Sequence, residues 1–225
     1  MAGALQIAIA SEQPLRYPFY SFFEAEYDDK DYALNMKTET VAFRSDELKI
    51  AHSKVERRLE CQCKGLLEVG RSHVNLLHRT VSDFLSTREM SDYLLSKSLP
   101  TFCPKLSILR ATLAFLKNMS RTITERVESE YPVGEDGGEV RSQINHAIRL
   151  ASEIEDESLD LLEVLEDILD DIELAICKLN AQSTPFIALN FPITHYDGAM
   201  MYFRVQLIKG GAVEYRHSLL WITKL

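Results

Sequence analysis

Residues able to do chemistry are present in this sequence, but they form no complete catalytic set. The six histidines occur singly along the chain, at His52, His73, His78, His146, His195 and His217. No segment matches G-x-x-x-x-G-K-[ST], whose backbone amides and lysine would hold phosphates. Patterns for dinucleotide binding, a nucleophile elbow and a zinc hydrolase are also absent. The sequence therefore predicts no catalytic residues and no cofactor, and we do not expect an enzyme.

The cysteines do not predict a disulfide framework or a metal site. The chain has 225 residues and four cysteines, at Cys61, Cys63, Cys103 and Cys177. This number is too small and the spacing too irregular for a disulfide scaffold, so reduced thiols are the better interpretation. Cys61 and Cys63 could supply two metal ligands, but a structural zinc site needs four.

The acidic charge of the protein belongs to one segment. The net charge is −9, yet residues 151–173 alone hold eleven acids and no lysine or arginine. The rest of the chain is therefore almost neutral. A protein that binds the phosphate backbone needs a concentrated basic face. The charge pattern therefore argues against nucleic acid as the main partner.

Nothing in the sequence predicts secretion or membrane insertion. The first ten residues are apolar, but no lysine or arginine precedes Arg16, so the positive region of a signal peptide is missing. The longest uncharged run, 179–196, contains Pro185 and Pro192 and several polar residues. A membrane-spanning helix of about 20 apolar residues would not tolerate them. We therefore expect a cytoplasmic protein without a membrane partner.

The first half of the chain predicts helices around a β-hairpin. Residues 4–10 are typical of the end of a helix, and Pro14 and Pro18 predict an extended segment leading into an aromatic cluster that packs in the core. Apolar residues at three- and four-residue steps predict a helix over 46–63, which Gly65 ends. Two short apolar runs, 66–69 and 74–78, flank a turn at Gly70 and predict a β-hairpin.

A further helix is predicted directly after the hairpin. Thr80 and Asp83 resemble a capping box in its aspartate variant, and the helix would continue through Val81, Phe84 and Leu85. Helices followed by a two-stranded hairpin and another helix outline a winged helix-turn-helix.

The second half of the chain predicts an α-helical bundle. One helix begins at about Leu106, with Leu109, Leu113 and Leu116 on one side. After a loop at 131–138, a long helix is predicted over 139–179, with a break near Glu155 left open. Its apolar seam is expected to face the core and its acids to form a solvated face. The seam consists of Leu161, Leu165, Ile168, Ile172, Ala175 and Leu179.

The predicted fold class is mainly α with a small β-hairpin, a winged helix-turn-helix followed by an α-helical bundle. We expect a winged-helix-like domain with an N-terminal helix remnant at 1–99 and a helical domain with an acidic amphipathic helix at 100–182. The remaining residues, 183–225, form a tail of uncertain structure, in which 199–208 could be helical.

One region resembles a known family. The string Leu-His-Arg-Thr-Val-x-Asp-Phe-Leu at 77–85, together with Cys-Lys-Gly-Leu-Leu-Glu-Val at 63–69, resembles the region that follows the nucleotide-binding module in fungal NACHT-type STAND ATPases, which are related to NOD-like receptors. The similarity extends from about Leu5, through the stretch 27–35, to Leu116. From 139 to 211 it is looser.

The resemblance implies a role for His78 as the winged-helix histidine that contacts the β-phosphate of bound ADP when an ATPase module is present. Arg79, Thr80 and Asp83 would support this motif. The residues themselves leave two interpretations open: His78 would lie beside a helix N-terminus whose amides could also face a phosphate, or it makes a structural hydrogen bond at the hairpin–helix junction.

The important departure from that family is the absence of its ATPase motifs. The chain begins where that module would end, so we expect either a fragment of a longer signalling receptor or a remnant that lost its motor. The expected function is a non-enzymatic regulatory module whose partner is an ATPase module, in cis or in trans.

Two alternatives remain open. One is a stand-alone interaction module in which the acidic helix 151–179 binds other proteins. The other is a DNA-binding winged helix, which the charge balance of only +1 over 46–64 disfavours.

Overall fold

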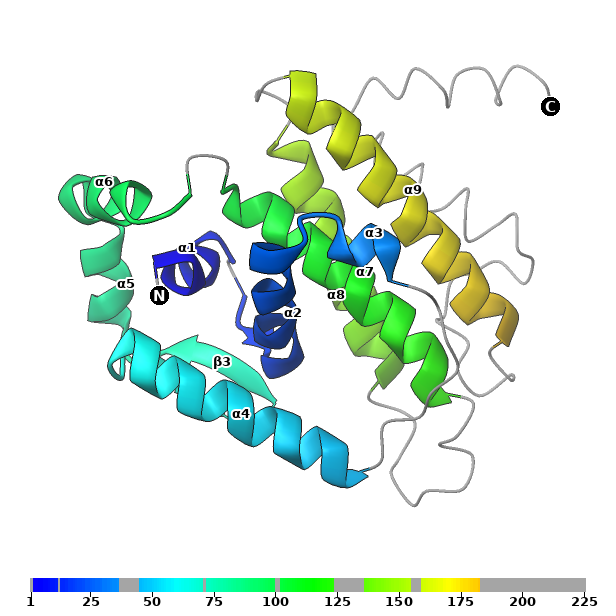
Figure 1. Ribbon diagram of the computed structural model, residues 1–225, viewed down its shortest axis with the longest axis horizontal. Coiled ribbons are helices and arrows are strands. Elements are labelled where there is room, and N and C mark those ends of the chain that lie inside the picture. Colours follow the sequence, from blue (N-terminus) through cyan, green and yellow to red (C-terminus); the bar gives the residue numbers. More distant parts are fainter. Residues whose placement is uncertain are drawn as a thin grey trace. The chain divides into compact units, whose positions relative to one another are not determined.

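The computed structural model describes residues 2–11, 13–36, 45–70, 72–99, 102–123, 136–154 and 159–182 (Figure 1). The chain divides into two compact units, and each is described by itself. Unit 1 comprises Met1–Tyr32 and Phe43–Ala111, and unit 2 comprises Ala33–Ala42 and Thr112–Leu225. The described residues are mainly helical with one small antiparallel sheet, which confirms the predicted fold class.

Unit 1 begins with helix α1 (Ala2–Ala10), strand β1 (Leu15–Arg16) and helix α2 (Tyr17–Asp28). The aromatic cluster packs as predicted, because Phe19, Tyr20 and Phe23 are buried. The expected extended segment is confirmed only at Leu15–Arg16, because Pro18 already lies in the first turn of α2. A proline is tolerated there because the first helical amides have no intrahelical acceptor.

The predicted helix over 46–63 is confirmed as α4 (Ser45–Cys63). Its inward side buries Val55, Leu59 and Cys63. The helix ends in a left-handed turn, in which Lys64 has φ 52° and Gly65 has φ 78°. Glycine adopts this conformation without steric cost, which explains why Gly65 ends the helix.

The predicted hairpin is confirmed and belongs to a three-stranded sheet. Strands β2 (Leu67–Val69) and β3 (His73–Leu76) pair antiparallel, and β1 pairs with the other edge of β3, giving the order β1-β3-β2. The sequence did not predict β1. The chain order α1, β1, α2, α4, β2, β3 is that of a winged helix-turn-helix, in which β2 and β3 form the wing.

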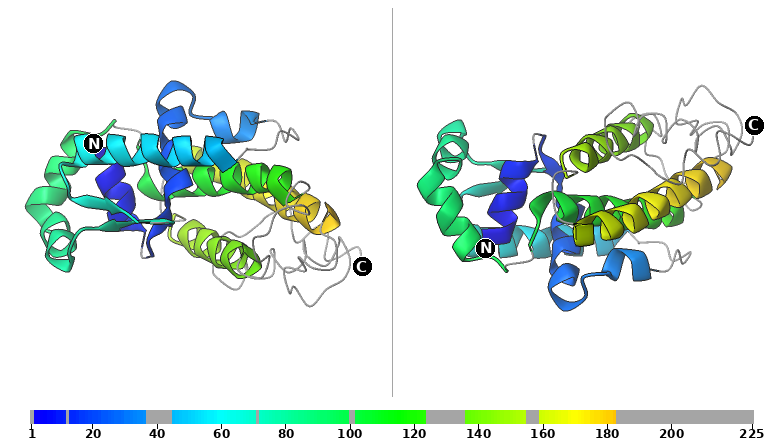
Figure 2. Two further views of the ribbon diagram at one scale, coloured as in Figure 1. Left: turned by 90° about the horizontal axis from the view of Figure 1, so that it is seen from below. Right: turned by 90° about the horizontal axis from the view of Figure 1, so that it is seen from above.

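Two short helices, α5 (Arg79–Leu85) and α6 (Arg88–Ser96), complete this part of unit 1. Each buries a leucine, Leu85 in α5 and Leu94 in α6. The sequence analysis predicted α5 but not α6. In both views of Figure 2 the two helices lie together at the end of unit 1 that also holds α1.

Helix α7 (Pro104–Ile123) contributes residues to both units. It confirms the predicted helix from about Leu106, and Leu109, Leu113 and Leu116 are fully buried. Part of the predicted loop, 131–135, lies outside the described residues, while 136–138 already belong to the next helix.

The long predicted helix is divided, as the sequence left open near Glu155. Helix α8 (Asp136–Ser152) is followed by α9 (Leu159–Gln182). Of the predicted seam, Leu165, Ile168, Ile172 and Ala175 are buried in unit 2. The predicted tail and the helix over 199–208 lie outside the described residues.

The prediction that the acids of this segment form a solvated face is only partly right. Glu163, Glu166, Asp167 and Asp170 are exposed, but Glu173 is only 4% exposed. Glu173 follows the buried Ile172 and lies on the inward side of α9, where periodicity alone would place an apolar residue. Among the described helices, none is both long and apolar enough to cross a bilayer.

Candidate functional site

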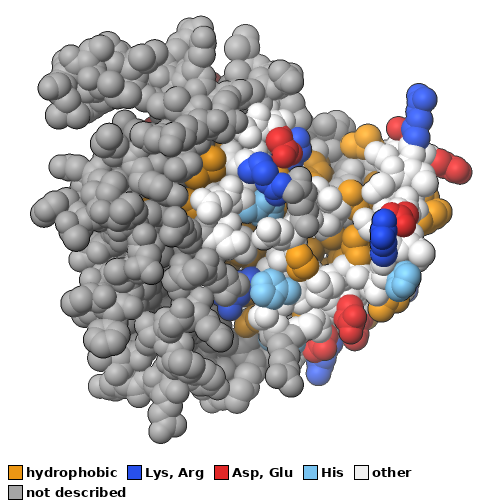
Figure 3. All heavy atoms as spheres, turned by 180° about the vertical axis from the view of Figure 1, so that it is seen from behind, with side chains coloured by type: hydrophobic (Ala, Val, Ile, Leu, Met, Phe, Trp, Pro, Cys, Tyr) orange, Lys and Arg blue, Asp and Glu red, His pale blue; other side chains and the backbone are white. Residues whose placement is uncertain are grey.

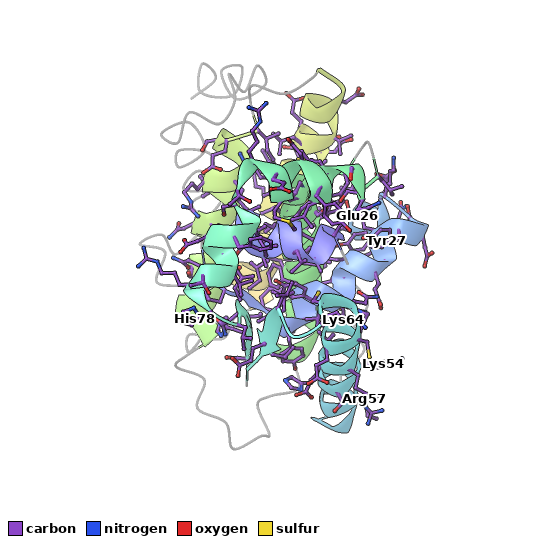
Figure 4. The ribbon with its side chains drawn as sticks, turned by 90° about the vertical axis from the view of Figure 1, so that its left-hand side faces the viewer. Glu26, Tyr27, Lys54, Arg57, Lys64 and His78 are labelled. Atoms are coloured by element: carbon purple, nitrogen blue, oxygen red, sulfur yellow. The ribbon has the colours of Figure 1, made fainter. Side chains whose placement is uncertain are left out.

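The candidate site lies where the hairpin ends and α5 begins. The pairing of β3 with β2 continues one residue further, because the Leu77 amide donates to the Leu66 carbonyl at 3.0 Å. Leu77 is nevertheless 56% exposed. His78 follows with extended backbone, φ −153° and ψ 154°, and the chain turns into α5 at Arg79. The strand end therefore places His78 at the surface, as Figure 4 shows on the side of unit 1 away from α4.

His78, not Thr80, caps helix α5. The Thr80 amide donates to Nδ1 of His78 at 3.2 Å, and the Thr80 hydroxyl lies 3.0 Å from the same nitrogen. The Val81 amide donates to the His78 carbonyl at 2.9 Å. The predicted capping box at Thr80 is therefore wrong: the imidazole supplies the acceptor that a serine or aspartate usually supplies.

This cap fixes the orientation of the imidazole. Because Nδ1 accepts from the Thr80 amide, the neutral ring must carry its proton on Nε2. No interaction engages Nε2 in the part of the chain that the structure describes, and the side chain is exposed. His78 therefore presents one N–H donor to whatever approaches the hairpin–helix junction.

The backbone amides in the first turn of α5 are less available to an anion than the sequence suggested. Those of Thr80 and Val81 are already bonded to His78. Helix α5 has only seven residues, so its dipole is small. Anion binding at this junction would therefore depend on the imidazole itself.

The structure brings the other predicted site residues onto the same short helix. Arg79, Thr80 and Asp83 are all exposed on α5, and Thr80 contacts His78 directly. Phe84 beside them is 55% exposed. The four residues that the resemblance singled out thus lie within about one and a half helical turns.

Sequence reasoning missed a buried polar cluster in unit 1. Arg110 on α7 donates to Oε1 of Glu26 on α2 at 2.6 Å, and both side chains are about nine-tenths buried. Burial, together with the Glu26 carboxylate, raises the pKa of Tyr32. Within the described ranges of the chain, Nε of Arg110, Oε2 of Glu26 and the Tyr32 hydroxyl have no hydrogen-bond partner. No local pattern could reveal this cluster, because Arg110 and Glu26 are 84 residues apart.

A second buried cation, Lys117, lies in unit 2 and is fully bonded. Its Nζ donates to the carbonyls of Ala33 and Leu34 at 2.8 and 3.1 Å, and to Oδ2 of Asp171 at 2.7 Å. These acceptors belong to helix α3 (Tyr32–Asn35) and to α9. Because an ammonium group has three donors, all of them are used.

The remaining titratable groups form no further site. His146 on α8 is buried, and burial lowers its pKa from the ordinary 6.5. Cys61 is exposed whereas Cys63 is buried, and residues two apart on a helix do not share a face. Among the described residues, no three His, Cys, Asp or Glu side chains gather as a metal site would require.

Comparison with known proteins gives one match. Residues 1–126 match a family described as Domain of unknown function (DUF7791), and this region covers more than half of the chain. It includes the winged-helix elements, α5, α6 and the whole of α7. No curated protein and no solved structure matches significantly.

Proposed function

We propose, on the premise that this chain belongs to the family described as Domain of unknown function (DUF7791), that it is a non-enzymatic regulatory module. It resembles the region after the ATPase module of fungal NACHT-type STAND proteins and would act in the cytoplasm. Its partner would be such an ATPase module, in cis or in trans. His78 would contact the β-phosphate of the ADP held by that module.

The orientation of His78 supports this proposal most directly. Nδ1 of His78 accepts the hydrogen bond of the cap, and the Nε2 proton remains on the exposed side of the ring. An N–H donor is suited to a phosphate oxygen of a bound nucleotide. The cap itself does not use the Nε2 proton, which is therefore available for a second interaction.

The first experiment is to sequence the complete transcript and to express its whole product. The cis form of the proposal expects an in-frame P-loop upstream and ADP that copurifies with the protein. A complete transcript without a P-loop would remove the cis form and leave only an ATPase partner in trans.

Two substitutions separate nucleotide contact from helix capping. Asparagine is a strong N-cap residue, so His78→Asn keeps an acceptor for the Thr80 amide but removes the Nε2 donor. His78→Ala removes both. We expect faster ADP release in both variants, but a loss of thermal stability only in His78→Ala. Unchanged ADP release in His78→Asn would make His78 a structural cap.

The non-enzymatic part of the proposal has its own test. We expect no magnesium-dependent ATP turnover by the purified 225-residue chain, because it has no P-loop motif. Steady turnover that tracks with the protein through a final purification step would contradict this.

A second candidate function is a stand-alone interaction module. The observation that favours it is the exposure of Glu163, Glu166 and Asp167 on α9, whose opposite side is buried in the core of unit 2. The helix is thus held in place and presents its carboxylates outward. The buried seam itself is not available to a partner.

A further inference from the structure

The outward side of α4 carries a row of exposed residues, here called the basic stripe. It consists of Ile50, Lys54, Arg57 and Lys64. The steps of four and three residues keep Ile50, Lys54 and Arg57 on one side of the helix, and Lys64 lies in the left-handed turn just after its end. Ile50, an apolar residue, is 62% exposed. Figure 4 labels Lys54 and Arg57 beside α4 and Lys64 at the end of the helix.

The cations of the basic stripe differ from their neighbour Arg58. Arg58 turns inward and contacts the Glu24 carboxylate and the Tyr20 carbonyl. No ion pair engages Lys54, Arg57 or Lys64 within the described residues. On the face drawn in Figure 3, by contrast, positive and negative side chains are mixed. The basic stripe is therefore a row of cations without an ion pair among the described residues, although the segment 46–64 as a whole has a charge balance of only +1.

The outward side of α9 carries a row of the opposite sign, here called the acidic stripe. Leu174 at one end is 42% exposed. The other members are all exposed carboxylates on the same side of the helix: Glu163, Glu166, Asp167 and Asp170. Each stripe therefore has an exposed apolar residue at one end and charges of a single sign beyond it.

The two rows match in spacing when the helices run in opposite directions. Arg57 lies seven residues after Ile50, and Asp167 lies seven residues before Leu174. Both separations equal about 10 Å along a helix. With Ile50 against Leu174, Arg57 meets Asp167. The charges then oppose each other along the contact, which fixes both register and direction.

We propose that the basic stripe of one copy of this chain docks antiparallel on the acidic stripe of a second copy. Each copy carries both stripes, so the contact joins two different surfaces of neighbouring copies and can either close or continue from copy to copy. The inference specifies a partner for the interaction-module function and does not depend on the role of His78. Exposed ion pairs are weak and screened by salt, so we expect a salt-sensitive, concentration-dependent assembly.

Charge reversal of the two stripes provides the test. One variant reverses the basic stripe (Lys54→Glu with Arg57→Glu), and another reverses the acidic stripe (Glu163→Lys with Asp167→Lys). All four residues are exposed, so both variants should fold. A control matched to the basic-stripe variant, Arg88→Glu with Lys97→Glu, makes the same change of net charge on exposed residues of α6 and its end.

Sedimentation velocity of the full chain would measure the assembly. We expect the wild type to gain mass with concentration at low salt and to lose it at about 0.5 M salt. Each stripe variant should associate at least about tenfold more weakly, and the control should behave as wild type. An equimolar mixture of the two stripe variants should recover association, because each then carries the complement of the other.

Several outcomes would overturn the proposal. One is a wild type that stays monomeric at every concentration and salt. A control variant as impaired as the stripe variants, or a mixture that fails to associate, would show that the charges act without specific pairing. Cysteines introduced at Arg57 and Asp167 could also form a cross-link only within single chains. That result would show that the two stripes contact each other within one molecule and not between copies. Loss of low-salt DNA binding in the basic-stripe variant, with unchanged mass, would assign α4 to nucleic acid.

The same measurement separates this inference from the proposal for His78. His78→Asn should leave the mass distribution unchanged, because His78 belongs to neither stripe. A wild type that does not assemble, together with faster ADP release in His78→Asn, would refute the stripe proposal alone. Assembly as expected, together with unchanged ADP release in His78→Asn, would refute the His78 proposal alone.

Discussion

Helix α7 supplies a buried cation to each unit, and the two cations are satisfied to different degrees. Arg110 in unit 1 has one hydrogen bond to Glu26, while its Nε and the second carboxylate oxygen have no partner. Lys117 in unit 2 uses all three of its protons, two of them on backbone carbonyls. Burial costs a charge much of its hydration, and only full bonding compensates for this loss.

The difference separates two roles for a buried ion pair. In unit 2 the carbonyls of Ala33 and Leu34 depend on Lys117, so the cation holds the α3 backbone in place. In unit 1 Arg110 and Glu26 depend mainly on each other. We therefore expect the unit 1 pair to be replaceable as a pair, and the unit 2 cation to be irreplaceable.

The largest effect should come from Lys117→Met. It leaves two carbonyls without their donor and Asp171 without its partner, and we expect a loss of about 3–5 kcal/mol in the free energy of unfolding. Adding Asp171→Asn should restore little of this loss, because the carbonyls remain unsatisfied. Urea denaturation of the single and double variants measures both effects. Full recovery in the double variant would show that Lys117, like Arg110, can be replaced together with its carboxylate partner.

Arg110→Met should cost slightly less, about 2–4 kcal/mol, because it leaves the Glu26 charge buried and unpaired. Here a second substitution, Glu26→Gln, should recover most of the loss, since the amide needs no counter-charge. The same urea denaturation, analysed as a double-mutant cycle, gives the coupling between the two residues. A double variant as unstable as the single one would show that Arg110 has a role beyond Glu26.

A smaller effect concerns pH and unit 2. Burial holds the pKa of His146 below its ordinary 6.5, so the unfolded chain binds more protons than the native one at mildly acidic pH. The contribution of His146 to the free energy of unfolding is therefore fully present above pH 6.5 and declines as the pH falls below it. His146→Gln should flatten the dependence of thermal stability between about pH 7 and about pH 5. An unchanged slope would place the titrating group elsewhere.

The smallest effect should come from the cap of α5. His78→Ala should lower stability by about 0.5–1 kcal/mol, whereas His78→Asn should be close to neutral. Because the site is exposed and in unit 1, neither variant should alter the pH dependence attributed to His146. Thermal denaturation at two pH values tests both expectations. A large loss in His78→Asn would mean that the imidazole has a further structural contact.

Local patterns predicted much of the fold. Periodic apolar residues located α4, α7 and α9, and Gly65 and Gly70 marked the helix end and the hairpin turn. Strand β1 was missed because two residues are too few for an alternating pattern to be visible. Helix α6 was missed because it is short and buries only Leu94, although its apolar residues do gather on one side.

The residues of the candidate site were predicted, but the hydrogen bonds between them were not. The resemblance selected His78, yet the cap was expected at Thr80, because histidine is not among the usual N-cap residues. The buried partners of Arg110 and Lys117 could not be found from the sequence, since Glu26 is 84 residues from Arg110, and Ala33 and Asp171 are 84 and 54 residues from Lys117. Glu173 was misplaced because it lies within an acidic run that otherwise faces solvent.

The central position of β3 has a consequence for the order of events during synthesis. Leu15 and Arg16 emerge from the ribosome early, but their strand partners, Val74 and His73, are translated much later. At a translation rate of about 5–20 residues per second, several seconds pass between the synthesis of β1 and that of β3, and during this time β1 has no strand to pair with. Its short length is an advantage in this interval, because two residues present little edge for a wrong partner. The sheet of unit 1 is thus completed only when the hairpin reaches back to the beginning of the chain.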